Sequence, residues 1–375
     1  MPIYKTDDKN DGLVKYRVVV SYKDLEGKYK KKERHVYGKE EAKREEARLL
    51  AEVGGSSAIK TVQDLYNEYM YSIRKEIRES TFDKKRRIIE GNVLPTMAKV
   101  KLKDMDAAVL QKWKNTIAQA DISTRTKNNY FKEFVAMLNY AAKIGYIEKN
   151  TLSALGSFRD PDEIPTEGKL QYYTAEQFKT YIRVARQEAE LHNDYIGYAA
   201  YVFFCIAYYT GMRKGEINAL KWTDIDKDII HVRRSITQKI KGKTEVETPP
   251  KNKSSYRDIQ MPLPLITILL EHKDRQRAFF GSTKGRVCGG PETLRDTTIE
   301  NYNKKYSEMA GLPHIRIHDF RHSHASLLAN EGINISEIAR RLGHADIKMT
   351  LNTYSHLYPR EEERALNVLN KIFPE

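Results

Sequence analysis

Residues 318–326 read His-Asp-Phe-Arg-His-Ser-His-Ala-Ser, and this stretch is the most informative part of the chain for both fold and chemistry. It opens an expected helix on which His318 and Arg321, three positions apart, share one face. Four more segments carry functional side chains: Thr-Gly-Met-Arg-Lys-Gly-Glu at 210–216, Lys-Asn-Lys-Ser-Ser at 251–255, Leu-Gly-His at 342–344 and Asn-Thr-Tyr-Ser-His at 352–356. Taken singly, each segment has an ordinary structural explanation. A Gly-His pair, for example, commonly ends a helix.

Two local patterns suggest other chemistries. His318 and His322, four residues apart with an acidic residue between them, resemble a zinc-protease helix. That motif uses glutamate, whereas Asp319 has a shorter reach, and Arg321 would place a cation beside the metal. Residues 335–344 read as the first helix and turn of a helix-turn-helix, which would make the chain a DNA-binding regulator without catalysis.

Composition narrows the class of protein. The 375 residues include 65 Lys+Arg against 51 Asp+Glu, a net charge of +14, which favours a polyanionic partner and nucleic acid first. The longest apolar stretch, 196–209, is too short to span a bilayer, and no secretory signal is visible at the N-terminus. Two cysteines, Cys205 and Cys288, exclude a disulfide framework. We therefore expect a cytoplasmic protein.

Composition also divides the chain into domains. Residues 1–55 predict a small β-sheet, with strands at 16–22 and 29–37, followed by a helix at 40–52 and a Gly-Gly-Ser-Ser joint. Helical periodicity runs through an all-α domain at 59–153, and the Pro- and Gly-bearing segment 154–171 reads as a linker. Residues 172–375 predict a mainly helical α+β domain. It opens with a capping box at Thr174 and Gln177, contains one β region at 229–261 and ends in an amphipathic tail helix at 360–373.

Basic side chains recur in the first two domains. A run of basic residues is often only a solvated helix face, but recurrence in a small basic sheet and a small helical domain favours a DNA-facing surface. The candidate DNA-binding residues are Lys30, Lys31, Lys32, Lys84, Lys85, Arg86, Arg87, Arg125 and Lys127.

The five segments in their order (arginine, lysine, His-x-x-Arg, Gly-His, tyrosine) resemble the active site of the tyrosine recombinases, the family of the phage integrases. The resemblance covers the whole chain. It implies an arm-type DNA-binding domain at 1–55, a core-binding domain at 59–153 and a catalytic domain at 172–375. The implied function is site-specific integration or excision of a phage or an integrative conjugative element. A type IB topoisomerase shares the chemistry but would not need the arm-type sheet, and a helix-turn-helix regulator would form no covalent intermediate.

The resemblance also implies roles for the site residues. Arg213 and Arg321 would grip the non-bridging oxygens of the scissile phosphate with planar, permanently charged forks. His318 and His344 would complete this cradle as hydrogen-bond donors, with His318 also able to help move the tyrosine proton. Tyr354 would attack the phosphorus and hold the strand as a 3′-phosphotyrosine.

Other assignments leave alternatives. A lysine of the loop at 251–255 would protonate the leaving 5′-oxygen, and its distance from the following strand favours Lys253 over Lys251. Tyr358 lies one helical turn beyond Tyr354 and is the alternative nucleophile, but Pro359 follows it directly. We expect Glu216 to pair with Arg213 or hold its helix, and Asp319 to support the site in a similar way.

The resemblance implies no metal, cofactor or ATP, because the phosphotyrosine link would conserve the energy of the broken phosphodiester bond. The implied partners are double-stranded DNA with core-type and arm-type attachment sites, and three further copies of the chain in a tetramer on DNA. An excisionase and a host DNA-bending protein are the accessory partners, and the implied location is the bacterial nucleoid.

Overall fold

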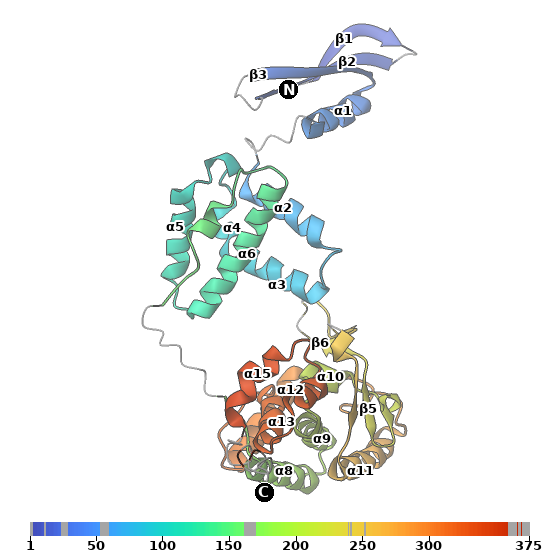
Figure 1. The fold of residues 1–375 in the computed structure, drawn as a ribbon. Coiled ribbons are helices and arrows are strands. Elements are labelled where there is room, and N and C mark those ends of the chain that lie inside the picture. Colours follow the sequence, from blue (N-terminus) through green and yellow to red (C-terminus); the bar gives the residue numbers. More distant parts are fainter. Residues whose placement is uncertain are drawn as a thin grey trace. The chain divides into compact units, whose positions relative to one another are not determined.

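The computed structural model describes residues 3–10, 13–23, 29–52, 60–160, 170–238, 240, 242–250 and 253–358, with Leu366 and Leu369. The chain forms two compact units, Met1–Ile164 and Pro165–Glu375 (Figure 1). Apart from Leu366 and Leu369, the tail helix expected at 360–373 falls outside the described residues, and so does Lys251. Within the described ranges, no helix combines the length and the apolar character needed to cross a membrane.

The first unit begins with a three-stranded antiparallel sheet in the order β1-β2-β3. Its strands are β1 (Ile3–Asn10), β2 (Leu13–Lys23) and β3 (Tyr29–Tyr37), and helix α1 (Lys39–Glu52) packs on β2 and β3. Alternate residues of β2 face the helix, so that Val18 and Val20 form a small core with Ala42 and Leu49. The sequence predicted the two later strands and the helix. It did not reveal β1, whose second half is polar and lacks a strand pattern.

The rest of the first unit is helical. It comprises α2 (Val62–Ile73), α3 (Glu79–Asn92), α4 (Leu94–Met97), α5 (Ala107–Ala118), α6 (Thr124–Lys143) and α7 (Thr151–Ala154). Apolar faces at helical spacing meet in one core, where the rings of Trp113 and Phe134 make an edge-to-face contact at 4.9 Å. This core extends to Phe158, whose backbone exchanges two hydrogen bonds with the Asn128 side chain. The packed domain thus reaches into the segment that we expected to be linker from residue 154.

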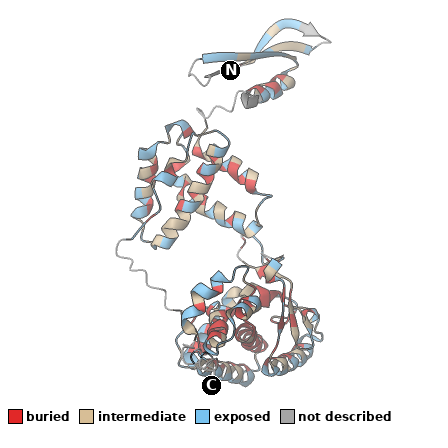
Figure 2. Cartoon of the chain, in the orientation of Figure 1, coloured by how far each residue is buried: buried red, intermediate tan, exposed pale blue. Residues whose placement is uncertain are grey.

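The second unit is built around helix α9 (Tyr195–Thr210), which is apolar on nearly every face and buried along its length. Around it lie α8 (Ala175–Leu191), α11 (Leu263–Phe280), α12 (Asp296–Met309) and α13 (Asp319–Asn330) (Figure 2). The expected capping box of Thr174 and Gln177 opens α8. Helices α14 (Ile335–Leu342) and α15 (Lys348–Tyr354) follow α13 and share a smaller core with it.

Short strands form one side of the second unit. β4 (Ile225–Asp226), β5 (Ile229–Val232) and β8 (Arg257–Gln260) make an antiparallel sheet, and β6 (Ser235–Thr237) pairs with β7 (Val246–Thr248). A single turn of 3₁₀ helix, η3 (Lys253–Ser255), precedes β8 and carries the candidate lysine. The two units together confirm the predicted mainly helical architecture with a small N-terminal sheet.

Candidate active site

Arg213 is placed by the abrupt end of the central helix. Helix α9 stops at Thr210, and Gly211 adopts a left-handed conformation with φ of 64°. A β-carbon at Gly211 would come within 2.7 Å of the His324 ring and 2.8 Å of Leu342, so only glycine fits this turn. The chain then re-enters a helix at α10 (Lys214–Ala219), with Arg213 at its N-cap.

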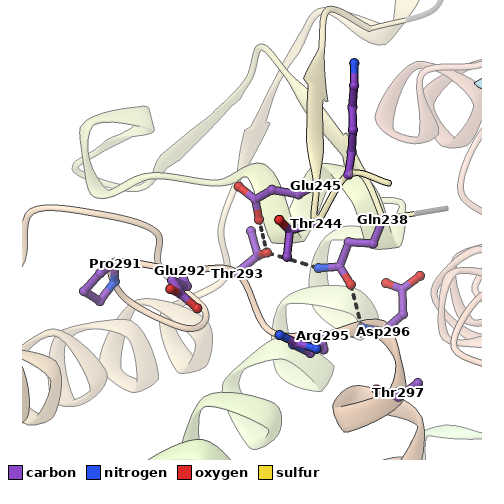
Figure 3. Close-up of a pocket in the computed structure, with 10 residues that line it drawn as sticks. Gln238, Thr244, Glu245, Pro291, Glu292, Thr293, Arg295, Asp296 and Thr297 are labelled. Atoms are coloured by element: carbon purple, nitrogen blue, oxygen red, sulfur yellow. Dashed lines mark hydrogen bonds between the residues drawn. The ribbon is translucent and has the colours of Figure 1, made fainter. Parts of the chain in front are cut away.

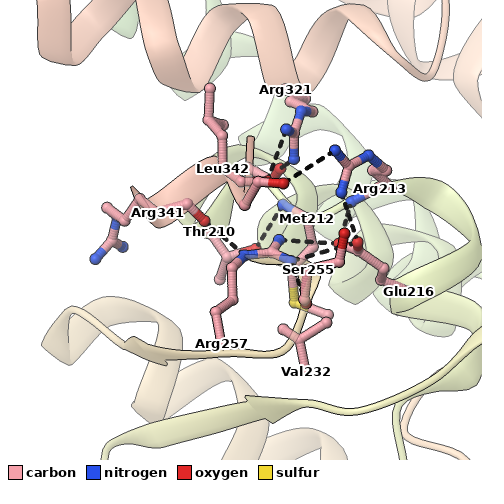
Figure 4. Close-up of polar contacts among 12 residues, drawn as sticks. Thr210, Met212, Arg213, Glu216, Val232, Ser255, Arg257, Arg321, Arg341 and Leu342 are labelled. Carbon is pink, nitrogen blue, oxygen red and sulfur yellow. Dashed lines mark hydrogen bonds and ion pairs between the residues drawn. The ribbon is translucent and has the colours of Figure 1, made fainter. Parts of the chain in front are cut away.

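Glu216 connects Arg213 to a second, buried arginine (Figure 4). Arg213 Nη1 donates to Glu216 Oε1 at 2.9 Å, and the Arg213 backbone N–H donates to Oε2 at 2.9 Å. From the other side, Arg257 Nη2 donates to Glu216 Oε2 at 2.9 Å. Burial by itself would raise the pKa of Glu216, but Arg257 and then Arg213 outweigh it and hold that pKa below its usual 4.5. Glu216 is therefore a carboxylate that both arginines share.

Arg321 lies on α13 with its guanidinium almost fully buried. Nη1 donates to Gly211 O at 2.7 Å, and Nη2 donates to Leu342 O at 2.7 Å and to His344 Nε2 at 2.8 Å. Burial, and next the charge of Arg213, lower the pKa of Arg321 to about 9, so the group still carries its charge at neutral pH. The turns that end α9 and α14 are thus joined by one arginine.

His344 follows Gly343, which ends α14 in a left-handed conformation. Because arginine offers no acceptor, His344 Nε2 accepts from Arg321, and Nδ1 carries the hydrogen that it donates to Thr350 Oγ1 at 2.7 Å. Burial, followed by the charges of Arg321 and Arg213, lowers the pKa of His344 to about 4. In this structure the imidazole is therefore neutral and accepts a hydrogen bond from Arg321.

His318 stands at the N-terminus of α13, in a turn that Asp319 holds closed. Both Asp319 carboxylate oxygens accept from Arg316, at 2.8 Å and 3.0 Å, and Asp319 is fully buried. Asp319 therefore holds this turn through Arg316. With both oxygens engaged, it is also poorly suited to the zinc-site role. Burial, then His322 and Arg321, lower the pKa of His318 to about 4.

Tyr354 is the last residue of α15 and is 2% exposed. Its hydroxyl lies 2.7 Å from His322 Nδ1. Burial raises the pKa of Tyr354 to about 12, although the charge of Arg321 opposes this. Tyr358, the alternative nucleophile, donates its hydroxyl to Ile333 O at 2.5 Å.

The candidate lysine reaches the same region through a close backbone approach. Lys253 is exposed at the start of η3, and the backbone oxygen of the next residue, Ser254, lies 3.0 Å from where a β-carbon of Gly343 would sit. Arg257 Nε, at the start of β8, donates to Arg341 O at 2.7 Å. The turn with Lys253 is therefore fastened beside the turn with His344.

The candidate DNA-binding residues differ in their exposure and in the contacts that they make. Lys85 pairs with Glu133 at 2.6 Å, and Arg86 and Arg87 both pair with the buried Asp83, at 2.6 Å and 3.1 Å. Lys127 donates to Ala118 O at 2.7 Å. The more exposed members of the set are Lys30, Lys31, Lys84, Arg87 and Arg125.

The second unit also contains a cavity of about 670 Å³, whose lining includes none of the predicted catalytic residues (Figure 3). Gln238 bridges one wall, donating to Thr293 Oγ1 at 3.1 Å and accepting from Asp296 N–H at 2.9 Å. Asp296 also pairs with Lys214 of α10. These contacts attach the β6–β7 hairpin and the start of α12 to the helix that Arg213 begins.

Comparison with known proteins identifies the family to which the chain belongs. Residues 172–361 match the Phage integrase family, and residues 61–118 match the Phage integrase, N-terminal SAM-like domain. The chain belongs to the phage integrase family. As a tyrosine recombinase it is an enzyme of DNA cleavage and rejoining, as its sequence predicted.

Similar proteins and structures extend over most of the chain. A tyrosine recombinase XerC-like protein of Caldanaerobacter subterraneus subsp. tengcongensis is 29% identical, covering 98% of this chain and 99% of that protein. The ICEBs1 integrase of Bacillus subtilis is 26% identical, with 82% of each chain covered. The Tn1549 transposon integrase in complex with transposon right end DNA has a TM-score of 0.60 at 20% identity, covering 84% of this chain and 99% of that chain. A lambda integrase tetramer bound to a Holliday junction has a TM-score of 0.55 at 17% identity, covering 92% and 96%. These structural likenesses show a shared fold.

Two residues with notable contacts in this region, Arg257 and His322, were not predicted from the sequence. Buried and exposed residues alternate along β8, and Arg257 occupies one of the buried positions. A cation at a strand position where an apolar residue is expected is the sequence signal that could have identified Arg257. His322 was visible in the motif, but nothing in the sequence showed that it meets Tyr354, 32 residues away.

Proposed function

We propose that this integrase cuts one strand of its DNA site with Tyr354, holds it as a 3′-phosphotyrosine and rejoins it to a partner strand, so integrating or excising a mobile element. The observation that carries the proposal is the meeting of Arg213, Arg321 and His344 at the ends of α9 and α14, beside the helix that bears Tyr354. We assign the catalytic roles to Arg213, Lys253, His318, Arg321, His344 and Tyr354, with Glu216 and Asp319 as supports.

The arginines stabilise charge on the phosphate. Attack at phosphorus increases the negative charge of the non-bridging oxygens, and fixed cations in a partly dehydrated site stabilise that charge strongly. Arg213 is oriented by Glu216, and Arg321 by two backbone carbonyls, so neither needs to reorganise far during the reaction. Loss of one such donor typically costs about 10²–10³-fold in rate.

The two histidines differ in how readily they can donate a hydrogen bond to the phosphate. His344 Nε2 accepts from Arg321 in this structure, so donation requires Arg321 to turn one N–H to the phosphate and His344 to take up a proton. A bound anion favours that uptake, because it offsets the charges of Arg321 and Arg213, which add to the effect of burial in lowering the pKa of His344. His318 carries a neutral ring at the start of α13 and can donate one ring N–H directly.

The strand that leaves needs a proton on its 5′-oxygen. The ammonium of Lys253 supplies it when the turn before β8 places that side chain over the phosphate, and Lys251 is the alternative donor. The bond from Tyr354 Oη to phosphorus forms while the bond from phosphorus to the 5′-oxygen breaks, so the number of phosphoester bonds is unchanged. Rejoining is the same step in reverse, without ATP.

The remaining parts of the chain suggest roles in assembly. We assign residues 1–55 to arm-type DNA sites, and residues 59–153 together with 172–375 to the core site. The exposed basic residues of β3, α3 and α6 would be the contacts to phosphate. The lambda integrase tetramer on a Holliday junction supports a tetramer of this chain on DNA. In this proposal the tail after Pro359 joins the subunits. An excisionase and a host DNA-bending protein are the accessory factors in this proposal.

The test is a trapping assay. The full chain is incubated with a nicked duplex carrying its core site, in EDTA and without ATP, and separated on a denaturing gel. We expect a covalent band with the wild-type chain and with Tyr358→Phe, and none with Tyr354→Phe, which should still bind the duplex. An adduct formed by Tyr354→Phe would refute the assignment of the nucleophile. Binding without any adduct would favour a helix-turn-helix regulator.

A further inference from the structure

The hydroxyl of the proposed nucleophile already has a partner that the five sequence motifs did not assign. His322 Nδ1 lies 2.7 Å from Tyr354 Oη, and the two rings are 5.9 Å apart. Tyr354 is 2% exposed, so the hydrogen bond is largely shielded from water. Among the described residues, this is the hydrogen bond that the structure gives to that hydroxyl.

The neighbours of His322 are occupied elsewhere. Arg321, the preceding residue, directs its guanidinium to Gly211 O and Leu342 O. His318, one helical turn earlier, meets the His322 ring edge-on, with ring centres 5.1 Å apart and planes at 89°. His322 therefore stands between His318 and Tyr354, and it is the imidazole that touches the reacting oxygen.

We propose that His322 is the catalytic base that takes the hydroxyl proton of Tyr354 during strand cleavage and returns it during rejoining. This inference rests on the proposed function, in which Tyr354 is the nucleophile. It replaces the expectation that His318 moves this proton. His318 remains a hydrogen-bond donor to the phosphate.

The protonation states suit this transfer. Burial, with help from Arg321 and Arg316 and against the effect of Asp319, lowers the pKa of His322, so its ring is neutral near pH 7. Burial raises the pKa of Tyr354 to about 12, so its hydroxyl keeps its proton until a base removes it. The charged and titratable groups around His322 are His318, Asp319, Arg316 and Arg321 on its own helix and the preceding turn, and Tyr354 on α15.

The step is balanced. As Tyr354 Oη bonds to phosphorus, its hydrogen passes to Nδ1 of His322, and the ring becomes an imidazolium with a hydrogen on each nitrogen. The bond from phosphorus to the 5′-oxygen breaks, and that oxygen takes its proton from the lysine of the 251–255 loop. In rejoining, the 5′-hydroxyl returns its proton to the lysine, the phosphotyrosine bond breaks, and His322 returns its proton to Tyr354.

Two substitutions separate a base from a residue that only positions the tyrosine. In His322→Asn the amide oxygen can occupy nearly the place of Nδ1 and accept the same hydrogen bond, but an amide does not take up a proton at neutral pH. His322→Ala removes both properties. His192→Asn, at an exposed histidine after α8, controls for the substitution itself.

The experiment measures single-turnover cleavage of the nicked duplex by the full chain, with DNA binding and thermal unfolding recorded for each variant. A general base typically contributes about 10²–10⁴-fold, so His322→Asn and His322→Ala should both lose at least about 100-fold, with binding retained. Cleavage by His322→Asn at close to the wild-type rate would overturn the proposal and leave His322 as a positioning residue. If Tyr354→Phe also forms adduct, the proposed function itself has failed.

A second substrate locates the missing proton. With sulfur in place of the bridging 5′-oxygen, the leaving group no longer needs a general acid, so this substrate should restore cleavage by a variant of the lysine that donates that proton. It should leave His322→Asn slow, because nucleophile activation is still absent. Replacing Tyr354 by a fluorotyrosine, whose hydroxyl is more acidic, should restore much of the rate of His322→Asn. Rescue of His322→Asn by the sulfur substrate, or no rescue by fluorotyrosine, would refute the role of His322 as base.

Discussion

Replacing Arg257 by methionine tests whether one buried ion pair holds the catalytic turns together. The Arg257 and Glu216 side chains are each 4% exposed, and Arg257 Nη2 and Nη1 lie 2.9 Å and 3.3 Å from the two Glu216 oxygens. Removing one partner of a buried pair costs about 3–5 kcal/mol. Methionine retains much of the apolar volume, and Glu216 keeps Arg213, so we expect a loss near the lower end, about 3 kcal/mol.

The assay must report on the catalytic unit alone. The chain has two tryptophans, Trp113 in the helical domain and Trp222 in the catalytic unit. In a Trp113→Phe background, the fluorescence of Trp222 follows urea unfolding of the second unit within the full chain. The matched control is Arg233→Met, which removes a surface pair with Asp258 of 2.6 Å whose side chains are 38% and 52% exposed. That control should cost no more than about 1 kcal/mol.

The pair also predicts a pH dependence and a loss of function. The pKa of Glu216 is lower in the folded chain than its usual 4.5, so the stability from this group is complete above about pH 4.5 and is lost as the pH falls below it. The difference between wild type and Arg257→Met should therefore shrink in acid. Because Arg257 also donates to Arg341 O, cleavage should slow as well. Equal losses of stability for Arg257→Met and Arg233→Met would refute this reasoning.

Three further outcomes are expected. Gly211→Ala and Gly281→Ala both force an alanine into a left-handed conformation, which costs about 1–2 kcal/mol of stability. Only at Gly211 does the new methyl group collide with neighbours, so only Gly211→Ala should also lose strand cleavage. Equal cleavage by the two variants would contradict the role of this turn. A 5′-phosphorothiolate duplex should restore cleavage by Lys253→Ala and not by Lys251→Ala, and the reverse pattern would make Lys251 the general acid. His272 is fully buried and its pKa is lowered to about 4, so its contribution to stability is present above pH 6.5 and declines as the pH falls towards 4. His272→Gln should flatten that decline in a pH series of urea unfolding curves, and an unchanged slope would count against it.

Much of the fold followed from local patterns. The capping box at Thr174, the apolar helix after residue 195 and the basic strand at 29–37 are each specified by residues close together in the chain. The first strand was missed because its polar second half gives no strand pattern, although it pairs with β2. Local patterns also did not show that Phe158, inside the segment expected to be linker, packs against Phe131 of a helix that precedes it by many residues.

The positive charge of a sequence segment did not predict which of its side chains are paired with acids in the fold. The sequence presents Lys85, Arg86 and Arg87 as equivalent members of one positive segment. In the structure Lys85 meets Glu133, and both arginines meet Asp83, which is buried and so requires a cation nearby. Whether a lysine is available to DNA depends on acids elsewhere in the fold.

The sequence by itself determined the family and the mainly helical fold of this protein, and it predicted the catalytic set: two arginines, a lysine, two histidines and a tyrosine in one order. These features are local, because helix periodicity, caps and short motifs depend on neighbouring residues. Only the tertiary structure decided which side chains meet. Packing of α13 against α15 brings His322 to Tyr354, and a buried carboxylate joins Arg213 to Arg257 across 44 residues of sequence. Such contacts arise from burial, since a polar group removed from water must find its partner wherever the fold supplies one.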